Sequence, residues 1–393
     1  MEIYKPNVTY LEDKVIISAP FKHNNNMMEL WYSFDIKYSR FLTVEKIDGF
    51  VVGLLLLSMK NGENINLKWP ISERLYYNLS NYYIGLLNMC IDGLKVIEIL
   101  PDKLDDGTSY PCFNYVGTGF SGGIDSFCTI YEHIFKENVP KNYKITHFTF
   151  NNVGSHGDLN SAKAKILFEK RYILLKQYAD EINIDFLKID SNLSDILMMD
   201  FEITHTIRNI SSILLLQRLF SKYYYASSTT YEDFKVSKEG NISSVDSISV
   251  NLLSTETLEF ILSGPQYTRT KKTELITAYE PSKRYLNVCT DEVSTTNCSV
   301  CFKCRRTLLT LDILGKLEEY ERVFDIKKYK INRDKYIYRT ILKSKIDPFN
   351  KEIIEFAKER EYPFSKKQKA VINVLFLIPK FVFNSRKKYK KIE

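Results

Sequence analysis

The stretch Phe120-Ser121-Gly122-Gly123-Ile124-Asp125-Ser126 decides the fold of this chain. Its two glycines lack a Cβ atom, so the backbone can adopt positive φ and turn main-chain N–H groups toward one concavity. Residues 127–135 read as a helix, so the loop would deliver an anion to a helix N-terminus. Phe113 to Val116 can form a strand before the loop. A strand, a glycine loop and a helix in this order predict a phosphate-binding site.

This loop is not a Walker loop, because no Gly-Lys-Ser/Thr follows at the required spacing. The pattern Ser-Gly-Gly-x-Asp-Ser instead resembles the signature of the PP-loop ATP pyrophosphatases, which cleave ATP between the α and β phosphates. A simple glycine turn capped by Ser and Asp is the structural alternative. The resemblance implies catalytic roles for Ser121, Asp125 and Ser126, and ATP contacts from Phe120, Ser121, Gly122, Gly123, Ile124, Asp125 and Ser126.

The composition indicates a globular protein with two or three structural units, since 44% of its 393 residues are hydrophobic and 13% aromatic. A net charge of +7 is mild for this length and does not argue for a nucleic-acid or membrane partner. No apolar signal segment opens the sequence, and the apolar runs at 50–59 and 371–383 are too short or too interrupted to span a bilayer. We expect a cytoplasmic protein.

Residues 1–112 carry no chemical motif and read as a small α+β accessory domain. Within it, Asp48 is expected to cap a helix that runs to Lys60 and ends at the following Asn-Gly pair. Pro101 to Pro111 is the expected linker to the next domain.

Residues 113–310 alternate between strands and helices, which predicts an α/β fold with a parallel sheet covered on both faces. Ligands of such sheets bind beyond the carboxyl ends of the strands. The glycine loop, Asn151-Asn152 and the Ser/Thr run at 227–230 all follow predicted strands. We therefore expect one site there, with Asn151 as a further ATP contact.

Residues 311–393 read as a helical, basic C-terminal extension. The basic runs at 327–345 and 386–391 are interpreted as solvated surface, with polyanion binding as the alternative.

Four of the seven cysteines fall within sixteen residues, which suits a metal better than a secreted disulfide framework. These are Cys289, Cys298, Cys301 and Cys304. Four thiolates satisfy a tetrahedral Zn²⁺ completely, so the site would be structural. An iron–sulfur cluster is the open alternative, because the Cys-x2-Cys-x2-Cys spacing also suits it.

The glycine loop and the cysteines, in this order, resemble the 7-cyano-7-deazaguanine synthase (QueC) family. Shorter segments agree: Arg208-Asn209 opens a predicted helix, Glu232-Asp233 follows a predicted strand, and Lys272 begins a Lys-Thr-Glu-Leu-Ile run. The resemblance covers about residues 114–310 and implies zinc at the four cysteines. It also implies substrate contacts from Arg208, Asn209, Glu232, Asp233 and Lys272. The sequence departs from the family at 151–156, where the family has Tyr-Gly-Gln-Arg-His.

This resemblance implies a PP-loop fold of the adenine nucleotide α-hydrolase type and an ATP-dependent ligase. Such an enzyme adenylates a carboxylate, here one like 7-carboxy-7-deazaguanine, and an amine then displaces AMP. Mg²⁺ is expected with ATP, and Asp125 would be its ligand or a brace of the loop.

Enlarged relatives of this kind occur in bacterial anti-phage defence. The acceptor is therefore either ammonia or an amine of a partner protein, and the enzyme itself can be a homo-oligomer. Two other functions stay open. One is a tRNA thiolase, for which Cys128 is the only cysteine near the loop, and the other is a non-catalytic nucleotide-sensing subunit.

Overall fold

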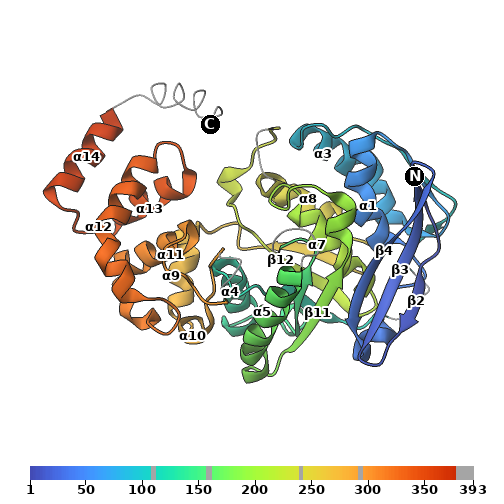
Figure 1. The fold of residues 1–393 in the computed structure, drawn as a ribbon, viewed down its shortest axis with the longest axis horizontal. Helices are drawn as coiled ribbons and strands as arrows, with labels where there is room; N and C mark the ends of the chain where they lie inside the picture. The colour runs from blue at the N-terminus through green and yellow to red at the C-terminus, as the bar shows by residue number, and fades with distance from the viewer. Residues whose placement is uncertain (108–111, 156–161, 239–241, 291–294, 378–393) are drawn as a thin grey trace. The chain divides into compact units, whose positions relative to one another are not determined.

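The computed structural model describes residues 1–107, 112–155, 162–238, 242–290 and 295–377 (Figure 1). They form two compact units: the first contains Met1–Ser121 and Thr129–Gln266, and the second contains Gly122–Cys128 and Tyr267–Glu393. The chain therefore leaves the first unit within the glycine loop and returns to it inside the following helix. The boundaries expected at residues 112 and 310 each fall inside one of these units.

The first unit is built on a mixed sheet. Among the described residues, eleven strands form it in the order β13-β12-β9-β10-β11-β4-β3-β1-β5-β7, with β2 paired to β3, while β6 and β8 form a separate pair. The strands are β1 (Glu2–Ile3), β2 (Asn7–Tyr10), β3 (Lys14–His23), β4 (Asn26–Asp35), β5 (Ile65–Leu67), β6 (Ile71–Ser72), β7 (Ile99–Pro101), β8 (Leu104–Asp105), β9 (Tyr115–Gly119), β10 (His147–Asn152), β11 (Asp185–Ser191), β12 (Phe220–Ala226) and β13 (Glu259–Ser263). Strands β9 to β13 pair in parallel, which confirms the predicted α/β sheet.

The parallel strands contain a topological switch. Along the chain, β10 and β11 add to one side of β9, and β12 and β13 then add to its other side. In open sheets of this kind, ligands bind outside the carboxyl ends of the strands at the point where the order reverses. That point lies between β9 and β12, and β9 runs directly into Phe120 and the glycine loop.

The N-terminal strands extend the same sheet beyond β11. Strand β4 lies antiparallel to β11, with Ser33 opposite Asp190 and Tyr32 opposite Ser191, and the long β3–β4 hairpin continues outward from there (Figure 1). The segment expected as a linker, 101–111, contains the end of β7 and all of β8, and its residues 108–111 lie outside the described residues. The N-terminal section therefore shares its main sheet with the segment that carries the glycine loop.

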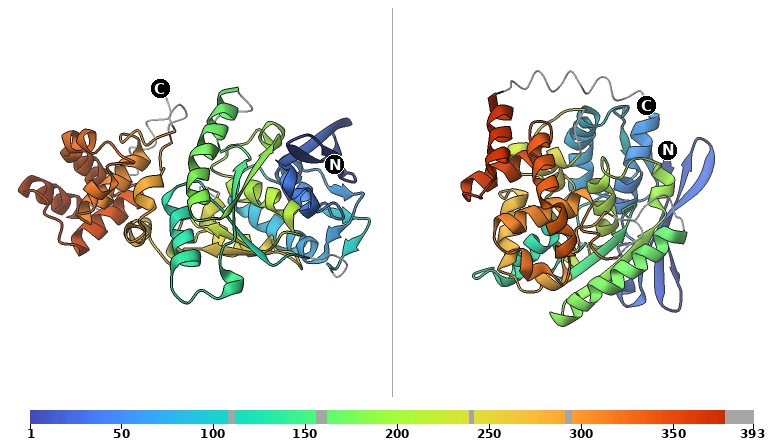
Figure 2. Two further views of the ribbon diagram at one scale, coloured as in Figure 1. Left: turned by 90° about the horizontal axis from the view of Figure 1, so that it is seen from below. Right: turned by 60° about the vertical axis from the view of Figure 1, so that its left-hand side comes forward.

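The helices of the first unit cover this sheet. They are α1 (Asp48–Asn61), α2 (Glu73–Asn78), α3 (Ile84–Cys90), α5 (Ala162–Glu181), α6 (Leu193–Leu197), α7 (His205–Ile213) and α8 (Asp246–Leu252). Helix α4 (Ile124–Ile130) belongs to the second unit as far as Cys128. Figure 2 shows α5 lying along the sheet, where it contacts β10 and β11. Helix α1 packs against α6 and α7, is buried along almost its whole length, and ends at Gly62 with a left-handed φ of 69°.

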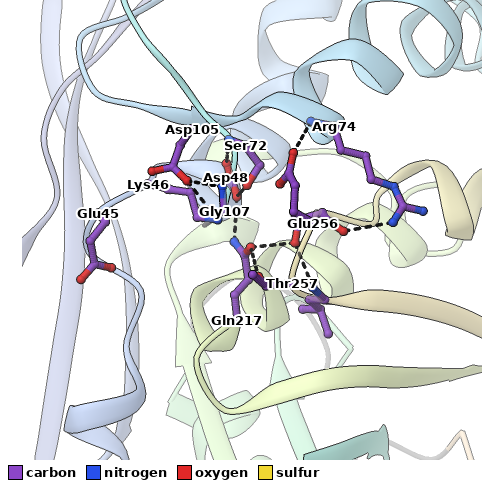
Figure 3. A network of polar contacts seen from close by, with 12 residues as sticks. Glu45, Lys46, Asp48, Ser72, Arg74, Asp105, Gly107, Gln217, Glu256 and Thr257 are labelled. Carbon is purple, nitrogen blue, oxygen red and sulfur yellow. Dashed lines mark hydrogen bonds and ion pairs between the residues drawn. The ribbon is translucent and has the colours of Figure 1, made fainter. Parts of the chain in front are cut away.

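Asp48 does not cap α1, contrary to the expectation from the sequence. Its buried carboxylate accepts hydrogen bonds from the main-chain N–H (2.9 Å) and hydroxyl (2.5 Å) of Ser72 and from Nε2 of Gln217 (2.7 Å), as Figure 3 shows. Oε1 of Gln217 in turn accepts a hydrogen bond from the Thr255 hydroxyl at 2.8 Å. Because an unpaired buried carboxylate is costly, Asp48 is committed to this network rather than to the helix end.

Gly49 lets α1 and α7 approach closely, and this gives a stability prediction. A Cβ atom at Gly49 would lie 2.6 Å from the main-chain oxygen of Ser211 and 2.8 Å from the Leu215 side chain. We expect Gly49→Ala to destabilise the protein by about 1–3 kcal/mol, the usual cost of overpacking. Gly85→Ala in α3 is the matched control, because its Cβ would meet nothing within 4 Å, and it should stabilise by about 0.5–1 kcal/mol. Urea unfolding measures both, and equal changes would contradict the prediction.

Asp246, at the start of α8, predicts a pH dependence of stability. Its Oδ1 accepts a hydrogen bond from the Thr206 hydroxyl at 2.9 Å, while its Oδ2 has no hydrogen-bond partner within the described parts of the chain. Burial raises the pKa of Asp246 to about 7, although hydrogen bonds from Thr206 and Ser249 oppose the shift.

The Asp246 carboxyl therefore stays protonated to higher pH in the folded protein than in the unfolded chain, where the pKa of an aspartate is about 4. Stability should fall as pH rises from about 4 to 7. An Asp246→Asn variant should lose this part of the pH dependence and be more stable than wild type at pH 8. Thermal unfolding across this range tests it, and an unchanged slope in the variant would refute it.

Beyond the glycine loop, the second unit is helical. Its helices are α9 (Arg269–Thr277), α10 (Ser282–Tyr285), α11 (Phe302–Ile313), α12 (Ile326–Lys343), α13 (Pro348–Glu359) and α14 (Lys366–Leu377). Leu309, Ile337, Ile341 and Ile353 are among the buried side chains that hold α11, α12 and α13 together. The predicted helical C-terminal part is confirmed for the residues described. In these residues, no helix has both the length and the apolar character needed to cross a membrane.

Candidate functional site

Phe120 anchors the start of the glycine loop to the core of the first unit. Its ring is buried against Phe148 and Tyr178, with centroid distances of 5.0 and 5.2 Å. Its N–H donates to the carbonyl of Thr149 on the neighbouring strand β10 at 2.9 Å. Any contact of Phe120 with a ligand in this arrangement would come from its backbone, whereas Ser121, the next residue, is exposed.

The glycine loop has the conformation that its sequence predicts. Gly122 has a φ of 75°, a left-handed value that favours glycine, and its carbonyl accepts a hydrogen bond from the N–H of Asn287 at 2.7 Å. The Gly123 carbonyl accepts hydrogen bonds from the Ser126 hydroxyl and the Phe127 N–H, both at 3.0 Å. Ser126 is buried, so its role here is to fix the turn into α4.

Asp125 is held by two cationic side chains from the N-terminal half of α9. Its Oδ2 lies 2.7 Å from Nη2 of Arg269, and its Oδ1 lies 3.2 Å from Nζ of Lys272. The Lys272 side chain is 3% exposed and that of Asp125 is 20% exposed. Burial alone would raise the pKa of Asp125, but the charges of Arg269 and Lys272 outweigh it, and the pKa is lowered.

These contacts join two elements that lie about 140 residues apart in the sequence and make Asp125 a brace of the loop. A third cation, Lys303, adds to the positive field at Asp125. Three cations therefore act on the Asp125 carboxylate, and a second carboxylate, that of Glu352, lies close to Arg269. Lys272 was predicted as a site residue. Arg269, three residues before Lys272 on the same helix, was not predicted, because it lies outside the motifs recognised in the sequence.

Asn151 and Asn209, expected as contacts for ATP and substrate, lie together in the first unit. Nδ2 of Asn151 donates to Oδ1 of Asn209 at 3.2 Å, and Asn209 also donates to the carbonyl of His205 at 2.8 Å. Asn151 is the second-last residue of β10 and lies at the edge of the sheet where β9 enters the loop, because Gly119 pairs with Thr149 two residues earlier. Both asparagines therefore lie at the carboxyl edge of the parallel strands.

Arg208 is 1% exposed, and the protein itself uses its donors. Nε donates to the Thr204 hydroxyl at 2.7 Å, and Nη2 donates to the carbonyl of Met199 at 2.6 Å. Nη1 donates to the Val153 carbonyl and the Ser194 hydroxyl, both at 3.2 Å. Burial lowers the pKa of Arg208 to about 10. In this structure Arg208 ties the segment after β10 to α6 and α7, so a direct substrate contact would require that network to open.

Glu232 and Asp233, the other expected substrate contacts, lie in an exposed turn after β12. Asp233 is committed locally, because its carboxylate accepts hydrogen bonds from the N–H and the hydroxyl of Thr230, both at 2.9 Å. This is a capping box, which fixes the turn without any ligand. Glu232, its neighbour in the turn, is exposed.

The four cysteines form a cluster in the second unit. Their sulfur atoms lie within 4.8 Å of one another, and the Cys289 and Cys301 sulfurs are 4.0 Å apart. Tetrahedral Zn²⁺ with Zn–S bonds of about 2.3 Å requires sulfur separations of about 3.8 Å. The arrangement is therefore compatible with zinc.

Main-chain N–H groups support the cysteine cluster. The N–H groups of Cys298, Cys301 and Cys304 donate to the sulfurs of Cys289, Cys298 and Cys301, at 3.4, 3.2 and 3.4 Å. The hydrogen bond with Cys301, burial and the neighbouring sulfurs together raise the pKa of the Cys304 thiol. Four negatively charged thiolates this close together would repel one another, and a bound divalent metal ion would offset that repulsion.

The remaining cysteines do not form a second centre of this kind within the described segments. Cys128, the residue that a thiolase would need, is 1% exposed inside α4. A buried thiol of this sort behaves as a small apolar side chain rather than as a nucleophile.

Comparison with known proteins adds no relative: no protein-family model matches the sequence, and no curated protein matches it.

Proposed function

We propose that this protein is an ATP-dependent ligase of the PP-loop type, which adenylates a carboxylate and releases pyrophosphate. The observation that carries the proposal is the glycine loop itself. It leaves β9 beside the topological switch of a parallel sheet, turns at Gly122 with positive φ, and enters α4 with Asp125 bound to two cations. This combination suits the binding of a polyphosphate.

In the proposed reaction, an oxygen of the substrate carboxylate attacks the α-phosphorus of ATP and the bond to the β-phosphate oxygen breaks. The products are an acyl-adenylate and pyrophosphate. An amine then attacks the acyl carbon, and AMP leaves with the bonding electron pair. Main-chain N–H groups of the loop from Ser121 onward would hold phosphate oxygens, and the positive charge at Lys272, Arg269 and Lys303 would stabilise the departing pyrophosphate.

The proposed substrate is a 7-carboxy-7-deazaguanine-like base, on the strength of the resemblance of the two motifs. Asn209 and Glu232 are the proposed contacts for the base, since Asn209 is partly exposed and Glu232 is exposed. The buried state of Cys128 favours this reaction over tRNA thiolation.

Zinc has a structural role in this proposal. The residues that would hold it are Cys289, Cys298, Cys301 and Cys304, and four protein ligands leave no open coordination position for substrate. Mg²⁺ accompanies ATP in the proposal but is assigned no ligand from Asp125, because both carboxylate oxygens already contact cationic side chains.

The direct test measures the products of ATP with candidate carboxylates. Release of AMP and pyrophosphate that depends on the carboxylate would support the proposal. Release of only ADP and orthophosphate with every carboxylate, or no turnover at all, would refute it and favour a nucleotide-sensing subunit.

The acceptor is tested separately by intact-mass spectrometry of proteins encoded beside this one and produced with it. An adduct of deazaguanine size that requires Asp125 would identify a protein amine as the acceptor. Free amide or nitrile with an unmodified partner would identify ammonia.

A further inference from the structure

Helix α13 belongs to the C-terminal extension, to which the sequence assigned no function, yet it contacts α9, which holds Asp125. Asp347 caps α13 by accepting a hydrogen bond from the N–H of Asn350 at 3.1 Å, and Pro348 occupies the first turn. Phe349 is therefore the second residue of a well-defined helix start.

The ring of Phe349 lies close to two guanidinium groups. The Cζ atom of Arg269 is 5.3 Å from the ring centroid, and the Cζ atom of Arg306 is 4.5 Å from it. Arg306 is itself held by an ion pair with Asp347 at 2.7 Å. Cation–π contacts of this kind are stronger when they are partly removed from water, as they are here for Phe349 and Arg306.

Two further contacts tie α13 to α9. At the start of α9, the N–H of Thr270 donates to Oε1 of Glu352 at 2.5 Å. Near the other end, Glu274 of α9 forms an ion pair with Arg360, which ends α13. Helix α9 is thus held to α13 at Thr270 and Glu274; Lys272 lies between these two contacts, and Arg269 directly precedes the first.

We propose that Phe349 is a positioning residue that orients Arg269 toward Asp125, so that the C-terminal extension is part of the ATP site. This inference rests on the proposed function for its catalytic consequence. Without the ring, the Arg269 side chain gains rotamers that point away from Asp125, and the glycine loop loses one of its two charged braces.

The kinetic test compares Phe349→Leu, which removes the ring, with Phe349→Tyr, which keeps it. We expect Phe349→Leu to raise KM for ATP about five- to tenfold, the scale of one cation–π contact, and to lower kcat as well, because Arg269 also stabilises the departing pyrophosphate in the proposed reaction. Phe349→Tyr should restore KM to within about twofold of wild type. Phe364→Leu is the matched control, because Phe364 packs against Tyr362 in the same unit and should leave KM unchanged.

A double variant decides whether Phe349 acts through Arg269. If it does, Phe349→Leu should have little further effect on KM once Arg269→Met is present. If the fold-change in KM of the double variant equals the product of the fold-changes of the two single variants, the inference is wrong. It is also wrong if Phe349→Tyr raises KM as much as Phe349→Leu.

Urea unfolding of the wild type, Phe349→Leu, Arg269→Met and the double variant makes the same comparison without an activity assay. Coupling of the two residues in the unfolding equilibrium constant would support the contact, and independent effects would overturn it. If wild type released no pyrophosphate, the proposed function would fail, and this second comparison would still test the placement of Arg269.

Discussion

Pyrophosphate release by an Asp125→Asn variant is expected to fall about a hundredfold or more, because a displacement of about 1 Å at a reacting group costs a factor of this size. The amide cannot supply the negative charge that lies 2.7 Å from Arg269 and 3.2 Å from Lys272. Lys272 is buried, and breaking a buried pair costs about 3–5 kcal/mol. The variant should therefore also be less stable. A coupled pyrophosphate assay and urea unfolding measure the two effects.

A second substitution separates these effects. In Asp125→Asn/Lys272→Met the buried charge is gone, so much of the lost stability should return while pyrophosphate release stays low. Recovery of activity together with stability would mean that Asp125 serves only the fold.

Lys271 offers a matched control for Lys272. It is the preceding residue on α9, but its side chain is 48% exposed and pairs with Glu274 at 2.7 Å. Exposed pairs of this kind contribute about 0–1 kcal/mol. Lys271→Met should retain activity within about twofold, whereas Lys272→Met should not, and equal losses in the two would contradict the assignment.

Loss of the metal is expected to have the largest effect on stability. We predict one Zn²⁺ per chain, and a structural zinc site contributes on the order of 10 kcal/mol to local folding. Cys298→Ser should remove one ligand and the sulfur that accepts the Cys301 N–H, so this variant should contain little metal and unfold at a lower temperature. Elemental analysis and thermal unfolding of protein purified without oxygen measure both quantities.

The free cysteine at 112 provides the control for this experiment. Cys112 lies outside the cluster, and its thiol faces main-chain carbonyls such as that of Gln217 at 3.2 Å. Cys112→Ser should keep one Zn²⁺ per chain. Iron and sulfide in wild type, with no zinc, would overturn the prediction, as would wild-type metal content and stability in Cys298→Ser.

The sequence predicted those parts of the site that depend on local chemistry. Gly122 needs positive φ in any tight phosphate loop, so its conformation could be read from the residue type. The cysteine spacing likewise predicts a cluster, because short spacings restrict the sulfur atoms to a small volume. The parallel sheet followed from the alternation of apolar strands with helices.

Long-range pairing could not be predicted in this way. The contact of Arg269 with Asp125 joins residues 144 apart, and nothing in either local pattern specifies it. Arg208 was expected to contact substrate, but the sequence does not reveal that four neighbours occupy its donors. The linker was predicted at residues 101–111 because this segment is rich in turn residues. Such residues also form turns within a single structural unit.

The junction between β4 and β11 limits how this protein can be shortened. A chain trimmed to begin near residue 112 would lose β4, which pairs with β11 at Asp190 and Ser191, and would leave this end of β11 on an open sheet edge. The apolar face of α7 would lose α1 at the same time. Such a fragment would tend to aggregate through that edge, so the N-terminal section behaves as a permanent border strand and cover.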